Sequence, residues 1–172
     1  AVSQGHDTLS DVLRTVRLRT AVFYYVSCDG DWVAEAPTSR QIATARAQTP
    51  NSLLFDNGDF LQGTPLADFV ASRSRRRRAH PVIAAFNTLG YDAVTLGNHE
   101  FNYGVPFLTS ALTDAQFPVV SANIVTRLGN SPLRDQTFVP PYAILKRRVM
   151  DRDGRMHNLR IGVIGFAPPQ IE

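Results

Sequence analysis

The chain carries at Ser52-Leu53-Leu54-Phe55-Asp56 a short apolar run, bounded by Thr49-Pro50-Asn51 before it and by Gly58 after it. This pattern predicts a buried strand. Two similar runs follow, Asp92-Ala93-Val94-Thr95-Leu96 and Pro118-Val119-Val120-Ser121-Ala122, and helix-like segments lie between the three. Strands that alternate with helices of this length indicate βαβ units and a largely parallel, buried sheet. The sequence therefore predicts an α/β fold.

Capping residues mark the helices of these units. Thr64-Pro65 predicts an N-cap and a first helical position, and Pro81 predicts the start of a second helix that ends before Gly90. A third helix should precede the strand at residues 118–122. The apolar positions expected on the core faces are Leu66, Phe69 and Val70 in the first helix, Val82, Phe86 and Leu89 in the second, and Phe107, Leu108, Ala111 and Leu112 in the third.

The two ends of the chain differ from this repeating pattern. At the start, residues 9–16 fit a helical stripe, whereas residues 16–20 alternate as a strand does, so both interpretations stay open. Pro37 to Gln48 predicts a helix that packs through Ile42 and Ala45. Near the end, residues 142–150 and 158–166 flank Asp151-Arg152-Asp153-Gly154, which is typical of a hairpin turn.

Composition bounds the class of protein. The chain has 172 residues, of which 44% are hydrophobic, and it has no short-period repeat, so we expect neither a disordered nor a collagen-like protein. Its longest purely apolar run, Ala21 to Val26, falls far short of the roughly 20 residues that cross a membrane. We expect an N-terminal tail or irregular segment over residues 1–15 and an incomplete domain over residues 16–172. The single Cys28 forms no internal disulfide, and we expect no signal peptide in this chain.

Positive charge is concentrated at one place. The net charge is only +3, but Arg73 and Arg75 to Arg78 form a dense cluster between two predicted helices. Such a cluster could bind nucleic acid or another anionic polymer. A solvated loop is the favoured interpretation, because no aromatic residue interleaves with the arginines. We therefore favour no nucleic-acid partner.

Two polar blocks follow directly on predicted strands. The first is Asp56-Asn57-Gly58-Asp59-Phe60-Leu61-Gln62-Gly63, and the second is Gly97-Asn98-His99-Glu100-Phe101-Asn102-Tyr103-Gly104. Carboxylate and amide oxygens can bind divalent cations, and a histidine can transfer a proton near neutral pH. Each block alone could be an ordinary turn or a structural histidine. Together, one βα unit apart, they point to a ligand site at the carboxyl edge of the sheet.

At these blocks the sequence resembles the metallophosphoesterase (calcineurin-like) signature. Residues 56–66, 97–104, 118–123 and 165–171 are similar to the 5′-nucleotidase family, and within it to the branch of periplasmic 2′,3′-cyclic-nucleotide 2′-phosphodiesterase/3′-nucleotidases. The resemblance implies part of a four-layer α/β/β/α sandwich, with the βαβ units and a C-terminal β-hairpin described above. It also implies a hydrolase of nucleotides or other phosphate esters, located in the periplasm or secreted.

The resemblance implies roles for three residues. Asp59 corresponds to the aspartate that bridges two divalent metal ions (Zn, Mn, Co or Mg) in this family. Asn98 corresponds to a ligand of the second metal ion, and His99 to the histidine that stabilises the phosphoryl transition state or protonates the leaving oxygen. Two cations about 3.5–4 Å apart that share a carboxylate activate water for in-line attack on phosphate. Asn102 stands where several relatives carry an aspartate that orients the histidine.

The chain also departs from the family pattern. The family opens with an Asp-x-His metal motif, which is absent between Val16 and Tyr25 and elsewhere in the chain. His6-Asp7 and Asp29-Gly30-Asp31 are weak substitutes. The family's later His and Gly-His-x-His motifs have no counterpart, because His80 and His157 match neither and should be structural or solvent-facing.

We therefore expect the N-terminal part of a two-metal nucleotide phosphohydrolase that lacks most metal ligands and the C-terminal substrate domain. The isolated chain should have little or no activity. Two alternatives stay open: an arginine-rich anion-binding or nucleic-acid-binding module, and a non-functional truncated relic of the enzyme.

Overall fold

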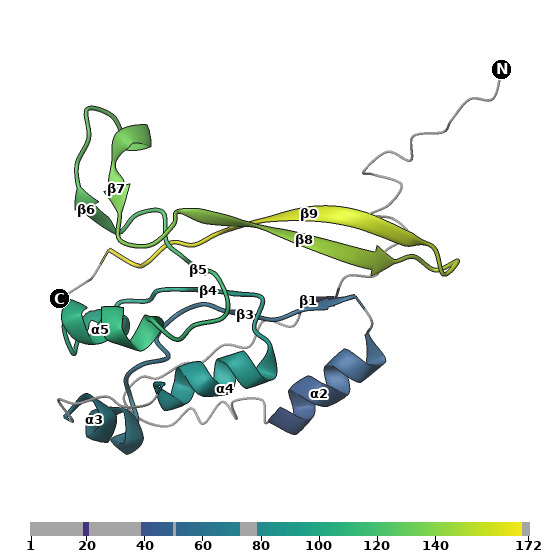
Figure 1. Cartoon of the computed structure of the whole chain (residues 1–172), viewed down its shortest axis with the longest axis horizontal. Coiled ribbons are helices and arrows are strands. Elements are labelled where there is room, and N and C mark those ends of the chain that lie inside the picture. Colours follow the sequence, from purple (N-terminus) through teal and green to yellow (C-terminus); the bar gives the residue numbers. More distant parts are fainter. Residues whose placement is uncertain (1–18, 21–38, 50, 73–78, 170–172) are drawn as a thin grey trace.

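The computed structural model describes residues 19–20, 39–49, 51–72 and 79–169. At its centre lies a parallel sheet of β3 (Phe55–Asp56), β4 (Ala93–Thr95) and β5 (Val119–Val120), in that order. The parallel pair β1 (Arg19–Thr20) and β2 (Ser52–Leu53) precedes β3. In Figure 1 the helices lie on one side of these strands and a long hairpin lies on the other. The predicted α/β fold with a parallel sheet and a C-terminal hairpin is confirmed.

The first predicted strand is interrupted at Leu54. The backbone N–H of Leu54 donates to the side chain of Asp92 at 2.7 Å, and its carbonyl accepts from the backbone N–H of Asp92 at 2.8 Å. A side-chain oxygen thus takes a position that a neighbouring strand would fill. The run over residues 52–56 therefore forms two short strands, β2 and β3, instead of one.

The three predicted helices are present. They are α3 (Pro65–Ala71), α4 (Pro81–Leu89) and α5 (Val105–Leu112). Thr64 caps α3 by accepting from the N–H of Ala67, and Gly90 ends α4 in the left-handed region at φ 67°, as predicted. The predicted core faces hold for α5, where Leu108 and Ala111 are buried.

The predicted core face of α3 is wrong. Leu66 and Phe69 are more than half exposed, and the buried residue is Ala67. On α4 the fully buried residue is Ile83, beside the predicted stripe. Three-residue spacing in a helix of only two turns does not fix which side meets the sheet, because two stripes fit so short a segment equally well.

The helix expected over residues 37–48 is α2 (Ser39–Gln48). Ile42 is buried as predicted, but Ala45 is exposed, which corrects the prediction for that residue. The segment over residues 9–16 lies outside the described residues, as does the proposed boundary at residue 15. The strand β1 falls within the residues 16–20 that alternate.

The C-terminal hairpin consists of β8 (Tyr142–Met150) and β9 (Met156–Ile164), paired antiparallel from Tyr142 opposite Ile164 to Met150 opposite Met156. The predicted turn is therefore confirmed, and β9 begins two residues earlier than expected. A second antiparallel pair, β6 (Val125–Arg127) and β7 (Gln136–Thr137), was not predicted from the sequence. Its strands are too short to show an alternation.

The core lies between the parallel sheet and the helices α4 and α5. Among the described residues, no helix is long and apolar enough to cross a membrane. Two buried clusters fill this layer, one of Leu61, Leu96, Leu108 and Ala111, and the other of Ile83, Val94 and Phe117.

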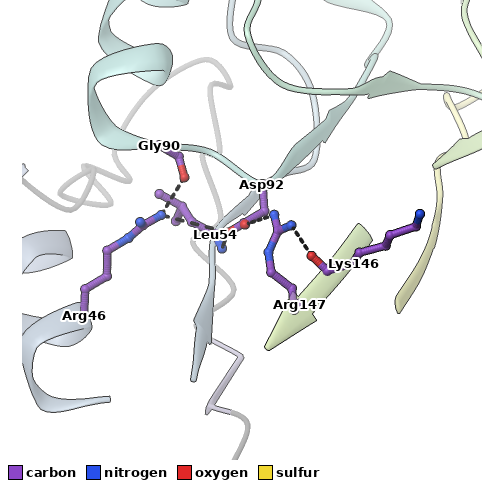
Figure 2. Close-up of polar contacts among 6 residues, drawn as sticks. All are labelled: Arg46, Leu54, Gly90, Asp92, Lys146 and Arg147. Carbon is purple, nitrogen blue, oxygen red and sulfur yellow. Dashed lines mark hydrogen bonds and ion pairs between the residues drawn. The ribbon is translucent and has the colours of Figure 1, made fainter. Parts of the chain in front are cut away.

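Asp92 joins the hairpin and α2 to the amino end of β4 (Figure 2). One carboxylate oxygen of Asp92 pairs with Arg147 of β8 at 2.5 Å, and the other accepts the N–H of Leu54. Arg46 of α2 lies 3.9 Å from the same carboxylate and donates to the carbonyl of Gly90 at 2.6 Å. The Asp92 side chain is only 12% exposed, so water supplies little of its solvation.

Replacing Asp92 with Asn is expected to lower the free energy of unfolding by about 2 kcal/mol. The amide has one acceptor oxygen in place of two, so either the Leu54 N–H or Arg147 loses its partner. Urea unfolding followed by circular dichroism measures this loss. Asp153→Asn on the exposed turn is the matched control, and an equal loss in both variants would contradict the role of Asp92.

Candidate active site

The two polar blocks meet at the carboxyl edge of the sheet, one after β3 and the other after β4. Their backbones touch between Gly58 and Gly97. A Cβ added to Gly58 would lie 2.2 Å from the backbone nitrogen of Gly97, and Gly58 has φ +98°. Only glycine allows this conformation and this approach without strain. The glycines of the two blocks therefore permit the polar side chains around them to share one site.

Glu100 ties the two blocks together. Its side chain is fully buried, and one carboxylate oxygen accepts the N–H groups of Phe60 and Leu61 at 2.7 and 3.1 Å. The other oxygen accepts the N–H groups of Asp59 and Gly97, each at 2.6 Å. Burial raises the pKa of Glu100, and the backbone hydrogen bonds act in the opposite direction. Sequence reasoning gave Glu100 no role, and its position within the second block was the only available signal.

Asp59 lies beside His99, as the sequence predicts. Asp59 has φ 64°, a left-handed conformation that is uncommon outside glycine and costs free energy. In this conformation its Oδ1 atom accepts the backbone N–H of His99 at 3.1 Å. The Glu100 bond to the N–H of Asp59 supports the strained turn. The loop geometry thus brings a carboxylate of the first block to the backbone of the histidine in the second.

His99 opens a 3-10 turn, His99–Phe101, and its ring is held through Nδ1. The Nδ1 atom lies 2.9 Å from Gln62 Oε1 and 3.1 Å from Asn102 Nδ2. Asn102 Nδ2 also donates to Gln62 Oε1 at 2.5 Å. Asn102 therefore contacts His99 although it is not the aspartate of several relatives. Gln62 is a site residue that sequence reasoning missed, since it was quoted only as part of the first block.

Asn98 precedes this turn and lies at its N-cap position without a side-chain capping bond. Its carbonyl accepts the N–H of Phe101 at 3.2 Å. The backbone of Asn98 thus has a structural role, and its side-chain amide is not used for capping. The structure places Asn98 directly between Gly97 and His99 at the edge of the sheet.

Asp56 ends β3 beneath the first block, and its Oδ1 accepts the N–H of Gly58 at 2.9 Å. Burial raises the pKa of Asp56 from 3.8 to about 6, and the nearby carboxylates Glu100 and Asp59 add to the rise. The folded protein therefore binds the Asp56 proton more tightly than the unfolded chain does.

The raised pKa of Asp56 predicts how the stability of the fold changes with pH. A raised folded-state pKa stabilises the fold below about pH 4, and the stabilisation is lost as the pH rises from about 4 to about 6. The Asp56→Asn variant should lack this loss, which amounts to at most about 3 kcal/mol. Urea unfolding of both proteins at pH 4 and pH 7 measures the difference. A wild-type protein that gains more stability than the variant over this range would contradict the prediction.

The described residues offer few donors for a pair of metal ions. No group of three or more His, Cys, Asp and Glu side chains that could hold a metal occurs among the described residues. A catalytic zinc site takes three protein ligands, and a pair of metals needs more. Asp59 and Asn98 supply oxygen atoms but are too few. The described part of the chain therefore does not by itself fit a metal pair.

Several predicted residues lie outside the described residues. One is the segment at residues 16–25 that lacks the Asp-x-His motif, of which only the β1 residues are described. The others are the weak substitutes at residues 6–7 and 29–31 and the arginine cluster at residues 73–78. Of the other histidines, His80 is buried and caps α4 by accepting the N–H of Val82 at Nδ1. His157 lies 2.8 Å from Asp151 beside the hairpin turn. Both histidines therefore have structural contacts.

Known proteins similar to this chain include nucleotide phosphoesterases. The chain is 42% identical over 163 residues to the 2′,3′-cyclic-nucleotide 2′-phosphodiesterase/3′-nucleotidase of Yersinia enterocolitica. This alignment covers 90% of this chain and 24% of the relative. It is 39% identical over 171 residues to the protein of the same name from Haemophilus influenzae, covering 94% of this chain and 25% of the relative. No protein-family model matches the chain.

The fold is also similar to those of solved structures in this group of proteins. The calcineurin-like phosphoesterase YfkN from Bacillus subtilis superposes with a TM-score of 0.70 at 40% identity, covering 80% of this chain and 41% of that one. A putative 5′-nucleotidase from Staphylococcus aureus superposes with a TM-score of 0.57 at 30% identity, covering 77% of this chain and 24% of that one. The chain spans about a quarter of the length of the Yersinia and Haemophilus relatives.

Proposed function

This chain belongs to the calcineurin-like phosphoesterases of the 5′-nucleotidase family, and from that premise we propose that it supplies one part of a phosphoryl-transfer site. The substrate class we propose is a nucleotide phosphate ester, either a 2′,3′-cyclic nucleotide or a 3′-nucleotide. The Yersinia and Haemophilus relatives are named for a 2′,3′-cyclic-nucleotide 2′-phosphodiesterase and a 3′-nucleotidase, which supports this class. Calcineurin-like phosphoesterases typically use divalent metal ions.

One observation carries the proposal. The two strand-end blocks are joined through Glu100, so that Asp59 Oδ1 accepts the His99 N–H at 3.1 Å. The proposal assigns His99 to the phosphate ester, and assigns Asp59 and Asn98 to the oxygen ligands of a divalent metal. A histidine at the edge of a parallel sheet is suited to proton transfer near neutral pH. The shortage of ligands limits what the chain does alone.

The isolated chain is expected to hydrolyse neither a chromogenic phosphate ester nor 3′-AMP, even with added Mn²⁺, Zn²⁺ or Mg²⁺. Two oxygen ligands bind a pair of metal ions too weakly to assemble the site. Release of phosphate or of the chromogenic alcohol measures the activity, with the Yersinia enterocolitica relative as the positive control. Robust turnover that disappears in Asp59→Ala or His99→Ala would overturn this part of the proposal.

A periplasmic or secreted location also belongs to the proposal, and the family resemblance alone supports it. Fractionation of the cells that make the protein, followed by immunodetection, tests the location. Recovery of the protein only with cytoplasmic markers would contradict it.

A further inference from the structure

The ring of His99 has a neighbour that can fix the position of its proton. Gln62 Oε1 lies 2.9 Å from Nδ1 of His99 and 2.5 Å from the amide nitrogen of Asn102. A carboxamide oxygen accepts hydrogen bonds and never donates them. The contact between Gln62 and the ring is therefore a hydrogen bond only when Nδ1 carries the proton.

Asn102 supports the same arrangement. Its side-chain nitrogen donates to Gln62 Oε1, so that the two lone pairs of this oxygen serve Asn102 and His99 together. The same Asn102 nitrogen lies 3.1 Å from His99 Nδ1, a contact that would be a hydrogen bond only if Nδ1 lacked the proton. In that tautomer the Gln62 oxygen and the lone pair of Nδ1 would repel each other at 2.9 Å, so the shorter contact favours the proton on Nδ1. The backbone before Gln62 is tied to the second block, because the N–H of Leu61 donates to the buried Glu100. The acceptor for the ring thus extends from a segment that is hydrogen-bonded to the block of His99.

We propose that Gln62 is a positioning residue that holds neutral His99 in the tautomer with its proton on Nδ1. The lone pair of the ring then lies on Nε2, which is the nitrogen left to exchange a proton with a bound phosphate ester. Several relatives carry at the position of Asn102 an aspartate whose carboxylate orients the histidine. In this chain the neutral amide of Gln62 would orient the ring instead. The catalytic consequence rests on the proposed function, whereas the tautomer does not.

The tautomer can be measured directly by ¹⁵N NMR of the imidazole rings in the 172-residue chain, at a pH where His99 is neutral. The protonated and unprotonated ring nitrogens have well-separated shifts, and a His99→Gln variant assigns the signals. Wild-type protein is expected to show the proton on Nδ1. Gln62→Leu should lose this preference, and Gln62→Glu, which retains an acceptor oxygen, should restore it.

Two further variants make the measurement specific. Asn102→Ala leaves the Gln62 oxygen in place and should retain the proton on Nδ1. The ring signals of His157, which contacts Asp151 through Nε2, should be the same in all variants. Unchanged backbone amide signals of Phe60 and Gly97 show that the Glu100 contacts persist in each variant.

A wild-type His99 ring with its proton on Nε2 would overturn the proposal, even if Gln62→Leu failed to fold. A folded Gln62→Leu protein that retains the Nδ1 proton would overturn it as well. In a longer protein that hydrolyses 2′,3′-cyclic AMP, Gln62→Leu should lower kcat by about tenfold or more and change KM little. If the Nδ1 tautomer is found but no such protein hydrolyses phosphate esters, the proposed function fails and the positioning role of Gln62 stands.

Discussion

Replacing Glu100 with Gln is expected to lower the free energy of unfolding by about 3 kcal/mol. The two carboxylate oxygens accept four backbone N–H groups, from Asp59, Phe60, Leu61 and Gly97. An amide turns a donor toward two of these groups, and each buried N–H without an acceptor costs about 1–3 kcal/mol. The measurement is urea unfolding at neutral pH, followed by circular dichroism.

The control for this variant removes a carboxylate that has no such contacts. Asp114 is exposed, and Asp114→Asn is expected to change stability by less than about 0.5 kcal/mol. In folded Glu100→Gln protein, the amide signals of Phe60 and Gly97 should also shift more than those of the hairpin. A Glu100→Gln protein as stable as the control would show that Glu100 does not hold the two blocks together.

The second large effect is expected for Gly97→Ala. A Cβ at this position would lie 2.1 Å from Asp59 Oδ1 and 2.9 Å from the backbone nitrogen of Asp59. Both distances are shorter than a Cβ atom can approach another heavy atom. Because the Asp59 loop is tied to Glu100, the two blocks must separate to make room. We expect a loss of about 3 kcal/mol or more, measured by the same unfolding experiment.

Gly162 in β9 provides the matched glycine. A Cβ at Gly162 would meet only Ile144 Cδ1, at 3.8 Å, which is an ordinary contact. Gly162→Ala should therefore change stability little or raise it, because alanine loses less conformational entropy on folding. If the two variants were equally stable, the close approach of the two blocks would not occur in solution.

Much of the fold could be predicted from the sequence, because the signals are local. Apolar runs located β3, β4 and β5, and the cap at Thr64 and the glycine at Gly90 located helix ends. The exposed side of α3 could not be predicted, since its orientation depends on packing against distant elements. The break at Leu54 likewise depends on Asp92, which lies 38 residues away in the sequence.

The site was predictable in part for the same reason. Asp59 and His99 stand in recognisable blocks, and the structure brings them together at the sheet edge. Apart from the bond between Gly97 and Glu100, the contacts that hold the site through Glu100 and Gln62 join residues about 40 positions apart. Residue spacing within one block carries no signal for such long-range hydrogen bonds.

We propose that this chain carries the carboxylate block and the histidine block of a nucleotide phosphoesterase. The most direct test is a chimera of the Yersinia enterocolitica relative in which residues 52–169 of this chain replace the aligned segment. The rest of the relative, including its first strand, is retained. We predict hydrolysis of 2′,3′-cyclic AMP by the chimera, lowered at least about 100-fold by His99→Ala and unaffected by His157→Ala. A folded chimera without activity, or one that keeps its activity with His99→Ala, would contradict the claim.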